Sequence, residues 1–250
     1  MRRILVVGAT SAIATACARC WLATDKERDT RFFLVGRNAE KLAETAADLG
    51  ARGAGAVHAF VTDLTDVSKH SALVEAAVGA LGGIDIALIA HGTLPVQAEC
   101  EQNELVMLRE FNNNGTSVLS VLTVIANVME KQRAGTIAVI TSVAGDRGRA
   151  SNYVYGSAKA AVSAFCEGLR VRLYRSGVHL VDIRPGFVDT PMTKGLSLPK
   201  RLVADPANVA RRIVAGVERR ADVLYTPAIW AWVMTAIRFL PRAIFKRLKL

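Results

Sequence analysis

The 250-residue chain has a formal net charge of +10, with 51% hydrophobic and 22% charged residues. This composition excludes an intrinsically disordered protein, and the chain is long enough for one large domain with a well-buried core. The positive charge is unevenly placed, because residues 223–250 hold five basic residues and no acidic one. Half of the excess charge therefore lies in the last 28 residues.

Short apolar runs rich in β-branched residues alternate along the chain with longer helical patterns. The runs that predict strands are Ile4–Val7, Arg31–Val35, Val57–Val61, Ile84–Ala90, Thr136–Thr141, His179–Ile183 and Val223–Tyr225. The patterns that predict helices are Ala12–Ala23, Ala39–Leu49, Val67–Leu81, Glu101–Lys131, Asn152–Ser176 and Val203–Arg220. This alternation predicts an α/β fold, a Rossmann-like doubly wound parallel sheet with helices on both faces. No linker or repeat divides the chain, so we expect a single domain over residues 1–222 and a hydrophobic, basic C-terminal tail over 223–250.

The four cysteines, Cys17, Cys20, Cys100 and Cys166, offer no metal-ligand spacing beyond one C-x-x-C inside an Ala-rich helical pattern. We interpret them as packing residues in a reducing compartment, and we expect no metal site. The N-terminus runs straight into a strand pattern without a secretory signal, so we expect a cytoplasmic protein.

A turn of small residues follows the first predicted strand and opens into a helix. Such a turn lets backbone N–H groups and the helix dipole approach a pyrophosphate. Alanines at 12 and 14 stand where the usual G-x-x-x-G-x-G spacing has glycine, and an ordinary strand–helix turn is the alternative. A cofactor that contains a pyrophosphate is predicted to bind here, at Gly8, Thr10, Ser11, Ala12 and Ile13.

The second predicted strand ends at Val35-Gly36-Arg37 without the carboxylate that an NAD-preferring site needs. Arg37 offers a guanidinium suited to a 2′-phosphate, and a solvent-exposed arginine is the alternative. We therefore predict that NADP(H) is preferred over NAD(H).

Further cofactor contacts are predicted at the ends of later strands. Asp63 and Leu64 are placed to contact an adenine, and the small residues around His91 leave room for the cofactor, although we assign His91 no acid or base role. These later positions are Asp63, Leu64, Ala90, His91, Gly92, Pro185, Gly186, Val188 and Thr190, and Tyr155 and Lys159 are predicted to contact the cofactor as well.

The segment Tyr155-Gly-Ser-Ala-Lys159 suggests catalysis, because a Tyr and a Lys four residues apart lie on one face of a helix. An ammonium beside a phenol is expected to lower the tyrosine pKa and make the hydroxyl a proton donor or acceptor near neutral pH. Ser142, at a strand end, is placed to hold a carbonyl oxygen. Asn112 begins an Asn-Asn-Asn-Gly run of poor helix propensity, which hints at a buried polar network.

These motifs, in this order and spacing, resemble the short-chain dehydrogenase/reductase family over nearly the whole chain. The resemblance implies that Tyr155 is the general acid/base and that Lys159 lowers its pKa and binds the nicotinamide ribose. It also implies that Ser142 positions the substrate oxygen, that Asn112 holds a water in the proton relay, and that the protein forms a homodimer or homotetramer. The two alanines in the glycine motif and Ala90-His91-Gly92 depart from the family pattern.

A narrower resemblance is to the decaprenylphosphoryl-2-keto-erythro-pentose reductase branch, through Ala90–Pro95, Asn152–Gly156 and the basic tail. It implies reduction of a 2-keto sugar on a polyprenyl phosphate, with a flavin oxidase partner. The alternatives are reduction of another apolar carbonyl, a 3-oxoacyl chain or a steroid-like ketone, and a catalytically silent nucleotide-sensing binding protein.

The tail has a ten-residue apolar run, Ala228–Ile237, which is too short to span a bilayer. Its tryptophans and cations suit an interfacial helix on anionic lipid, peripheral on the inner face of the membrane. The alternative is a helix that packs on the substrate pocket or on a neighbouring subunit. We expect no nucleic-acid contact.

Overall fold

The computed structural model describes residues 1–25, 27 and 29–248. Within these residues, seven strands form one parallel sheet in the order β3-β2-β1-β4-β5-β6-β7. The strands are β1 (Arg2–Val7), β2 (Thr30–Gly36), β3 (Ala56–Val61), β4 (Ile86–Ile89), β5 (Thr136–Ile140), β6 (His179–Pro185) and β7 (Val223–Thr226). The predicted Rossmann-like parallel sheet is confirmed.

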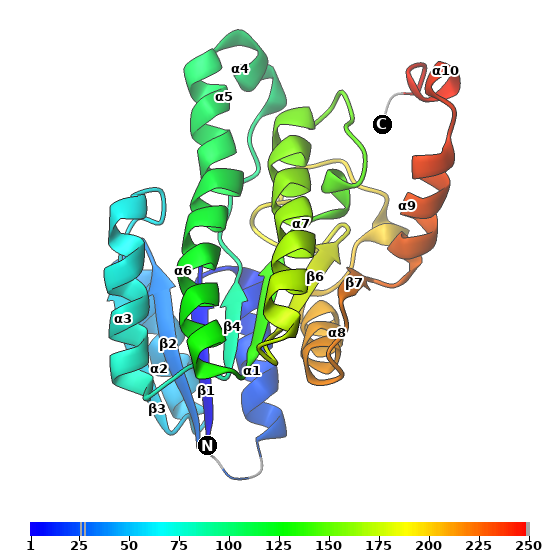
Figure 1. The fold of residues 1–250 in the computed structure, drawn as a ribbon. Helices are drawn as coiled ribbons and strands as arrows, with labels where there is room; N and C mark the ends of the chain where they lie inside the picture. The colour runs from blue at the N-terminus through cyan, green and yellow to red at the C-terminus, as the bar shows by residue number, and fades with distance from the viewer. Residues whose placement is uncertain (26, 28, 249–250) are drawn as a thin grey trace.

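Helices cover both faces of this sheet (Figure 1). They are α1 (Ala12–Thr24), α2 (Ala39–Ala51), α3 (His70–Leu81), α4 (Gln97–Gln102), α5 (Glu104–Phe111), α6 (Ser117–Gln132), α7 (Tyr153–Tyr174), α8 (Pro206–Glu218), α9 (Ile229–Phe239) and α10 (Arg242–Phe245), with short helical turns at Val67–Lys69, Val143–Gly145 and Lys200–Leu202. Alternate residues of each strand point to opposite faces. Leu5 and Val7 of β1 therefore pack with α3, α6 and α7, whereas Ile4 and Val6 pack with α1, α2 and α8.

The strand order places the candidate site between β1 and β4. These strands pair directly, with Val7 opposite Ile89, although β2 and β3 intervene in the sequence. The chain turns to opposite sides after β1 and after β4, which opens a crevice beyond their carboxyl ends. Sequence segments far apart along the chain meet at this edge.

The prediction of one helix over Glu101–Lys131 is wrong. The structure breaks it at Asn103, whose Oδ1 accepts hydrogen bonds from the N–H groups of Leu105 and Val106 and so starts α5. A π-helical segment over Asn112–Thr116 then separates α5 from α6. Asparagine and glycine have low helix propensity, so this run accommodates the wider turn.

The helix predicted over Val203–Arg220 is shorter in the structure. It begins at Pro206, because Asp205 caps the helix by accepting from the N–H groups of Ala207 and Asn208. Proline is favoured at a first helical position.

The end of the chain folds back beside the sheet's carboxyl edge. β7 pairs with β6 and belongs to the sheet, so the appended segment begins after Thr226. Trp230 and Met234 of α9 are buried against Val143, with Phe187 packed alongside. No helix among the described residues is long and apolar enough to cross a membrane.

Candidate active site

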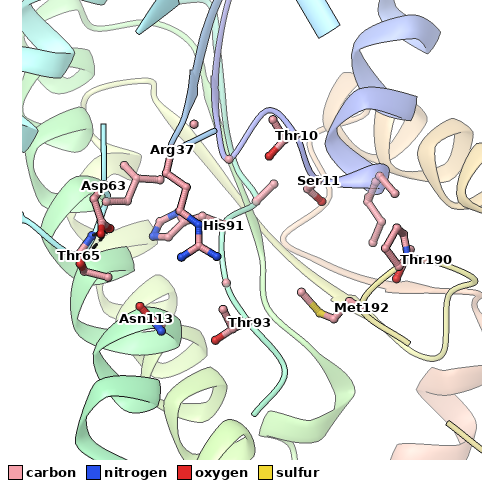
Figure 2. A pocket seen from close by; sticks show the side chains of 18 of the residues that line it. Thr10, Ser11, Arg37, Asp63, Thr65, His91, Thr93, Asn113, Thr190 and Met192 are labelled. Carbon is pink, nitrogen blue, oxygen red and sulfur yellow. Dashed lines mark hydrogen bonds between the residues drawn. The ribbon is translucent and has the colours of Figure 1, made fainter. Parts of the chain in front are cut away.

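A crevice of about 410 Å³ lies beyond the ends of β1 to β4 (Figure 2). It brings together most of the positions predicted to bind the cofactor: Gly8, Thr10, Ser11, Ala12, Ile13, Arg37, Asp63, Leu64, Ala90, His91, Gly92 and Thr190. The sequence reasoning missed other lining residues, among them Gly36, Thr62, Thr65, Thr93, Asn113, Pro191 and Met192. These carry no charge, and only the folding of the strand ends makes them neighbours.

Gly8 is a position that only glycine fits. Its φ is +85°, and a Cβ there would lie 2.6 Å from the backbone nitrogen of His91. The β1 and β4 ends can therefore approach one another closely beneath the crevice. Ser11 caps α1 without a side-chain hydrogen bond to the helix. Ala14, which replaces the third glycine of the motif, is fully buried where α1 packs on one face of the sheet.

Arg37 and Asp63 face the outer part of the crevice from β2 and β3 (Figure 2). The Asp63 carboxylate accepts from both the N–H and the hydroxyl of Thr65, each at 2.9 Å. These bonds, followed by the charge of Arg37, hold the pKa of Asp63 below its ordinary value. Asp63 thus orders its own loop. Among the residues that line the crevice, the exposed Arg37 is the one with a cationic side chain.

Ser142, Tyr155 and Lys159 line a second cavity, of about 170 Å³, that continues from the crevice. Ser142 follows β5, and its Oγ accepts from the N–H of Ala144 at 3.1 Å. Tyr155 and Lys159 lie one turn apart on α7, with the Lys159 Nζ 5.7 Å from the centre of the Tyr155 ring. The ammonium donates to the carbonyl oxygen of Ile140 at 3.3 Å. Pro185, Gly186 and Val188, predicted as cofactor contacts, line this cavity and not the crevice described above.

The pKa values of this pair differ from the sequence-based expectation. Burial raises the pKa of Tyr155 to about 12, with only the Ser142 hydrogen bond acting in the opposite direction. Burial also lowers the pKa of Lys159 to about 8, against the charge of Asp182. The expectation that Lys159 lowers the Tyr155 pKa is therefore wrong for this structure, because desolvation by burial dominates and the Lys159 ammonium is not among the groups that lower this pKa. At neutral pH Tyr155 is a protonated phenol and Lys159 is largely cationic.

Asn114, and not Asn112, reaches the cavity. The Asn114 Oδ1 accepts from the N–H of Thr93 at 2.9 Å, and its Nδ2 donates to the carbonyl of Glu110 at 3.0 Å. A Cβ on Gly92 would lie 2.7 Å from the Asn114 Oδ1 and 3.4 Å from the Lys159 Nζ, so these groups converge on one point. The carbonyl of Asn112 instead accepts from the N–H of Ser117 in the π-helical segment. The wider turn rotates the third asparagine of the run inward, and this rotation is not visible in the spacing.

His91 lies between the crevice and the cavity and lines both. Burial, reinforced by the Lys159 charge, lowers the pKa of His91 to about 3, so the imidazole is neutral. Its Nε2 lies 3.1 Å from the Ser117 Oγ. A neutral ring held in this way shapes the pocket and is not poised to exchange protons near pH 7.

A buried charge network supports the Ser142 side of the cavity. Arg184 of β6 donates to Asp182 at 2.8 Å and to Asp146 at 2.9 Å. The Tyr225 hydroxyl donates to the same Asp146 at 2.8 Å, and the Thr141 hydroxyl donates to Asp182 at 2.5 Å. These bonds join β6 and β7 to the loop that follows Ser142. They fix that loop while satisfying the buried charges.

Comparison with known proteins places the chain in a family. The family model described as short chain dehydrogenase matches residues 2–201. The chain belongs to this family. The most similar relatives include an uncharacterised oxidoreductase of Mycobacterium tuberculosis, 37% identical over 86% of each chain. Another is an uncharacterised oxidoreductase of Streptomyces coelicolor, 35% identical over 99% of this chain and 96% of the relative.

A solved structure shares the architecture of this short-chain dehydrogenase. A variant of the actinorhodin polyketide ketoreductase, crystallised with NADPH, superposes with a TM-score of 0.78. The two are 25% identical, and the match covers 90% of this chain and 95% of the ketoreductase. This protein is therefore a short-chain oxidoreductase that uses a nicotinamide cofactor. Three features fit such a cofactor. The ends of β1 and β4 lie close together at Gly8, the Ser11 side chain makes no hydrogen bond to α1, and a crevice lies beyond the carboxyl ends of β1 and β4.

Proposed function

We propose that this protein is an NADPH-dependent reductase that converts a ketone to a secondary alcohol. The observation that carries the proposal is the convergence of Ser142, a protonated Tyr155 and a cationic Lys159 on one cavity beside the nucleotide crevice. A phenol that keeps its proton at neutral pH suits a general acid, which reduction of a carbonyl requires. The bound cofactor supplies the hydride.

The residues divide the remaining work among them. The Ser142 hydroxyl donates a hydrogen bond to the ketone oxygen and orients it. Tyr155 gives its phenolic proton to the same oxygen as that oxygen gains charge. Lys159 places a positive charge beside the phenol. Its ammonium lies close to the Asn114 side chain, and we assign these two groups the return of a proton to Tyr155.

NADPH, rather than NADH, is the proposed cofactor because Arg37 is the cation beside the outer crevice. Its guanidinium fits the two negative charges of a 2′-phosphate. We expect Arg37→Ala to raise the Kd for NADPH at least tenfold and to leave the Kd for NADH nearly unchanged. Equal affinity of Arg37→Ala and the wild type for NADPH would remove this assignment, and Arg212→Met on the exposed surface of α8 is the control.

The proposed substrate is a 2-keto sugar carried on a polyprenyl phosphate, from the narrower resemblance of the sequence. Reduction of a 3-oxoacyl or steroid-like ketone is the second candidate, and the structural neighbour, a polyketide ketoreductase, favours it. A silent nucleotide sensor is less well supported, because it needs no convergent Ser, Tyr and Lys. Turnover of NADPH with the lipid-linked keto sugar, measured beside soluble 3-oxoacyl esters and simple ketones, separates these alternatives.

The tail is proposed to contact an anionic membrane surface. The inner face of α9 packs on the protein, but Trp232 and Phe239 on its outer face are 79% and 83% exposed. Arg238 lies between these two residues in the sequence, and Arg242, Lys246 and Arg247 follow them, in a segment with no acidic residue. Apolar and basic groups together favour adsorption to anionic lipid.

Co-sedimentation with phosphatidylglycerol vesicles tests this membrane contact. We expect the wild type to sediment with anionic vesicles and a Trp232→Ser/Phe239→Ser double variant to remain in the supernatant. Equal sedimentation of the two proteins would contradict a role for this face. Arg147, which donates to the carbonyls of Ile237 and Leu240 and stacks on the Phe245 ring at 3.8 Å, holds the tail in place and is left unchanged.

A further inference from the structure

The turn that leads into α7 carries two polar side chains that the proton-transfer scheme does not use. Arg149 and Asn152 line the substrate cavity together with Ser142 and Tyr155. The Asn152 N–H donates to the Arg149 carbonyl at 3.1 Å, so a single tight turn holds both residues. The two side chains therefore line the cavity in which Ser142 and Tyr155 are proposed to hold the reacting ketone.

Both side chains present buried polar atoms without a protein partner. The Arg149 Nε and the Asn152 Oδ1 are inaccessible to solvent and make no hydrogen bond within the described residues. Asn152 occupies the cap position of α7, yet its side chain does not cap the helix. Unpaired buried polar groups are costly, and a ligand that supplies an acceptor to Arg149 and a donor to Asn152 removes that cost.

The charge of the cavity is one-sided. Its lining includes the cations of Arg149 and Lys159 and, among the described residues, no aspartate or glutamate. The nearby Asp146 is already engaged by Arg184 and Tyr225. Burial lowers the pKa of Arg149 while Asp146 acts in the opposite direction, which places this guanidinium in a partly desolvated position. The N-terminus of the 22-residue helix α7 adds partial positive charge at the same end of the cavity.

We propose that Arg149 and Asn152 determine substrate specificity, and that the cavity accepts a ketone bearing an oxyanion, a phosphate ester or a carboxylate, together with a hydroxyl group. The inference rests on the proposed reductase function and names the class of ketone. The Arg149 guanidinium donates to the oxyanion, and the Asn152 Oδ1 accepts from the hydroxyl. Leu94, Phe187 and Leu196 line the cavity and contact the apolar remainder of the substrate.

Matched pairs of ketones test the proposal with the full-length enzyme and NADPH. Dihydroxyacetone phosphate is compared with dihydroxyacetone, and acetoacetate with ethyl acetoacetate, so each pair differs by the oxyanion. We expect the wild type to reduce the anionic member with a kcat/KM at least tenfold higher in one or both pairs. The phosphate pair and the carboxylate pair show which oxyanion the site prefers.

Variants assign the preference to the two residues. Arg149→Met is expected to lower kcat/KM for the anionic ketone about 10- to 100-fold, the effect of losing a charge-assisted hydrogen bond, and to leave the neutral ketone within about twofold. Asn152→Ala is expected to weaken turnover of dihydroxyacetone phosphate but not of acetoacetate, which has no hydroxyl. Arg212→Met, an exposed arginine on α8, is the control and should change neither, and thermal melts verify that each variant is folded.

The outcomes separate this inference from the function on which it rests. Equal wild-type kcat/KM for anionic and neutral members of both pairs overturns the inference and leaves the reductase function standing. An Arg149→Met variant that loses activity equally on all ketones also overturns it, because the residue would then be structural. Absence of NADPH consumption with every ketone overturns the proposed function and, with it, the inference.

Discussion

Lys159 is predicted to lower the stability of the folded protein, because its charged ammonium is buried in the cavity. The side chain is 3% exposed, and burial lowers its pKa from 10.5 to about 8. A difference of this size corresponds to a penalty of about 3 kcal/mol for holding the ammonium charged at neutral pH. The 3.3 Å hydrogen bond to the Ile140 carbonyl returns about 1 kcal/mol of this.

The Lys159→Met variant removes the charge and keeps an unbranched side chain of similar length. We expect its free energy of unfolding at pH 7 to exceed that of the wild type by about 2 kcal/mol, with a rise in Tm of about 4–8 °C, while turnover is lost. The sign of the pH dependence follows from the lowered pKa. Between about pH 8 and 10.5 the unfolded chain binds a proton that the folded chain does not, so wild-type stability rises with pH there relative to the variant.

Urea unfolding of both proteins at pH 7 and at pH 10 measures this difference. The stability gap should be largest below pH 8 and should close as the pH approaches 10.5. The exposed Lys131→Met in the last turn of α6 is the control, for which a change within about 0.5 kcal/mol is expected at both pH values. A Lys159→Met variant that is less stable than the wild type at pH 7, or a gap independent of pH, would refute the reasoning.

Three further predictions follow from the same region. The kcat/KM for ketone reduction should fall as the pH rises above about 8. Lys159 loses its proton there, while Tyr155 keeps its own up to about pH 12. A flat pH profile up to about pH 10 would contradict these assignments. Gly186→Ala should destabilise the protein by about 1–3 kcal/mol in thermal unfolding, because a Cβ at this position would overlap the buried Trp230 indole. An unchanged Tm would show that α9 shifts without cost to make room for the Cβ. Asp182→Asn should cost about 3–5 kcal/mol of unfolding free energy by leaving Arg184 without one buried partner, whereas a loss below about 1 kcal/mol would mean that Asp146 alone suffices.

The sequence predicted the sheet well because strand patterns depend on local composition. The buried runs Ile4–Val7 and Ile137–Val139 are apolar on both faces, as is typical of strands in a parallel sheet, and the structure has them in place. The spacing of Tyr155 and Lys159 likewise fixes their common face on any helix. Both features depend on the local sequence alone.

Other parts of the site depend on tertiary contacts and could not be predicted. The π-helical segment makes Asn114 the inward residue, and nothing in a run of three asparagines distinguishes the third from the first. The pKa of Tyr155 depends on how deeply the fold buries it, so the ammonium one turn away misled the sequence argument. Arg149 reads as one more arginine in a polar loop, and its position in the cavity follows only from the turn that joins it to Asn152.

The most direct test of the central claim compares the wild type with Tyr155→Phe in NADPH consumption across a panel of ketones, with NADPH affinity measured in parallel. We expect the wild type to consume NADPH and to form an equal amount of secondary alcohol. Tyr155→Phe should bind NADPH with a similar Kd but reduce no ketone at more than about one thousandth of the wild-type rate, because the proton donor is missing. A Tyr155→Phe variant that reduces ketones at the wild-type rate would contradict it.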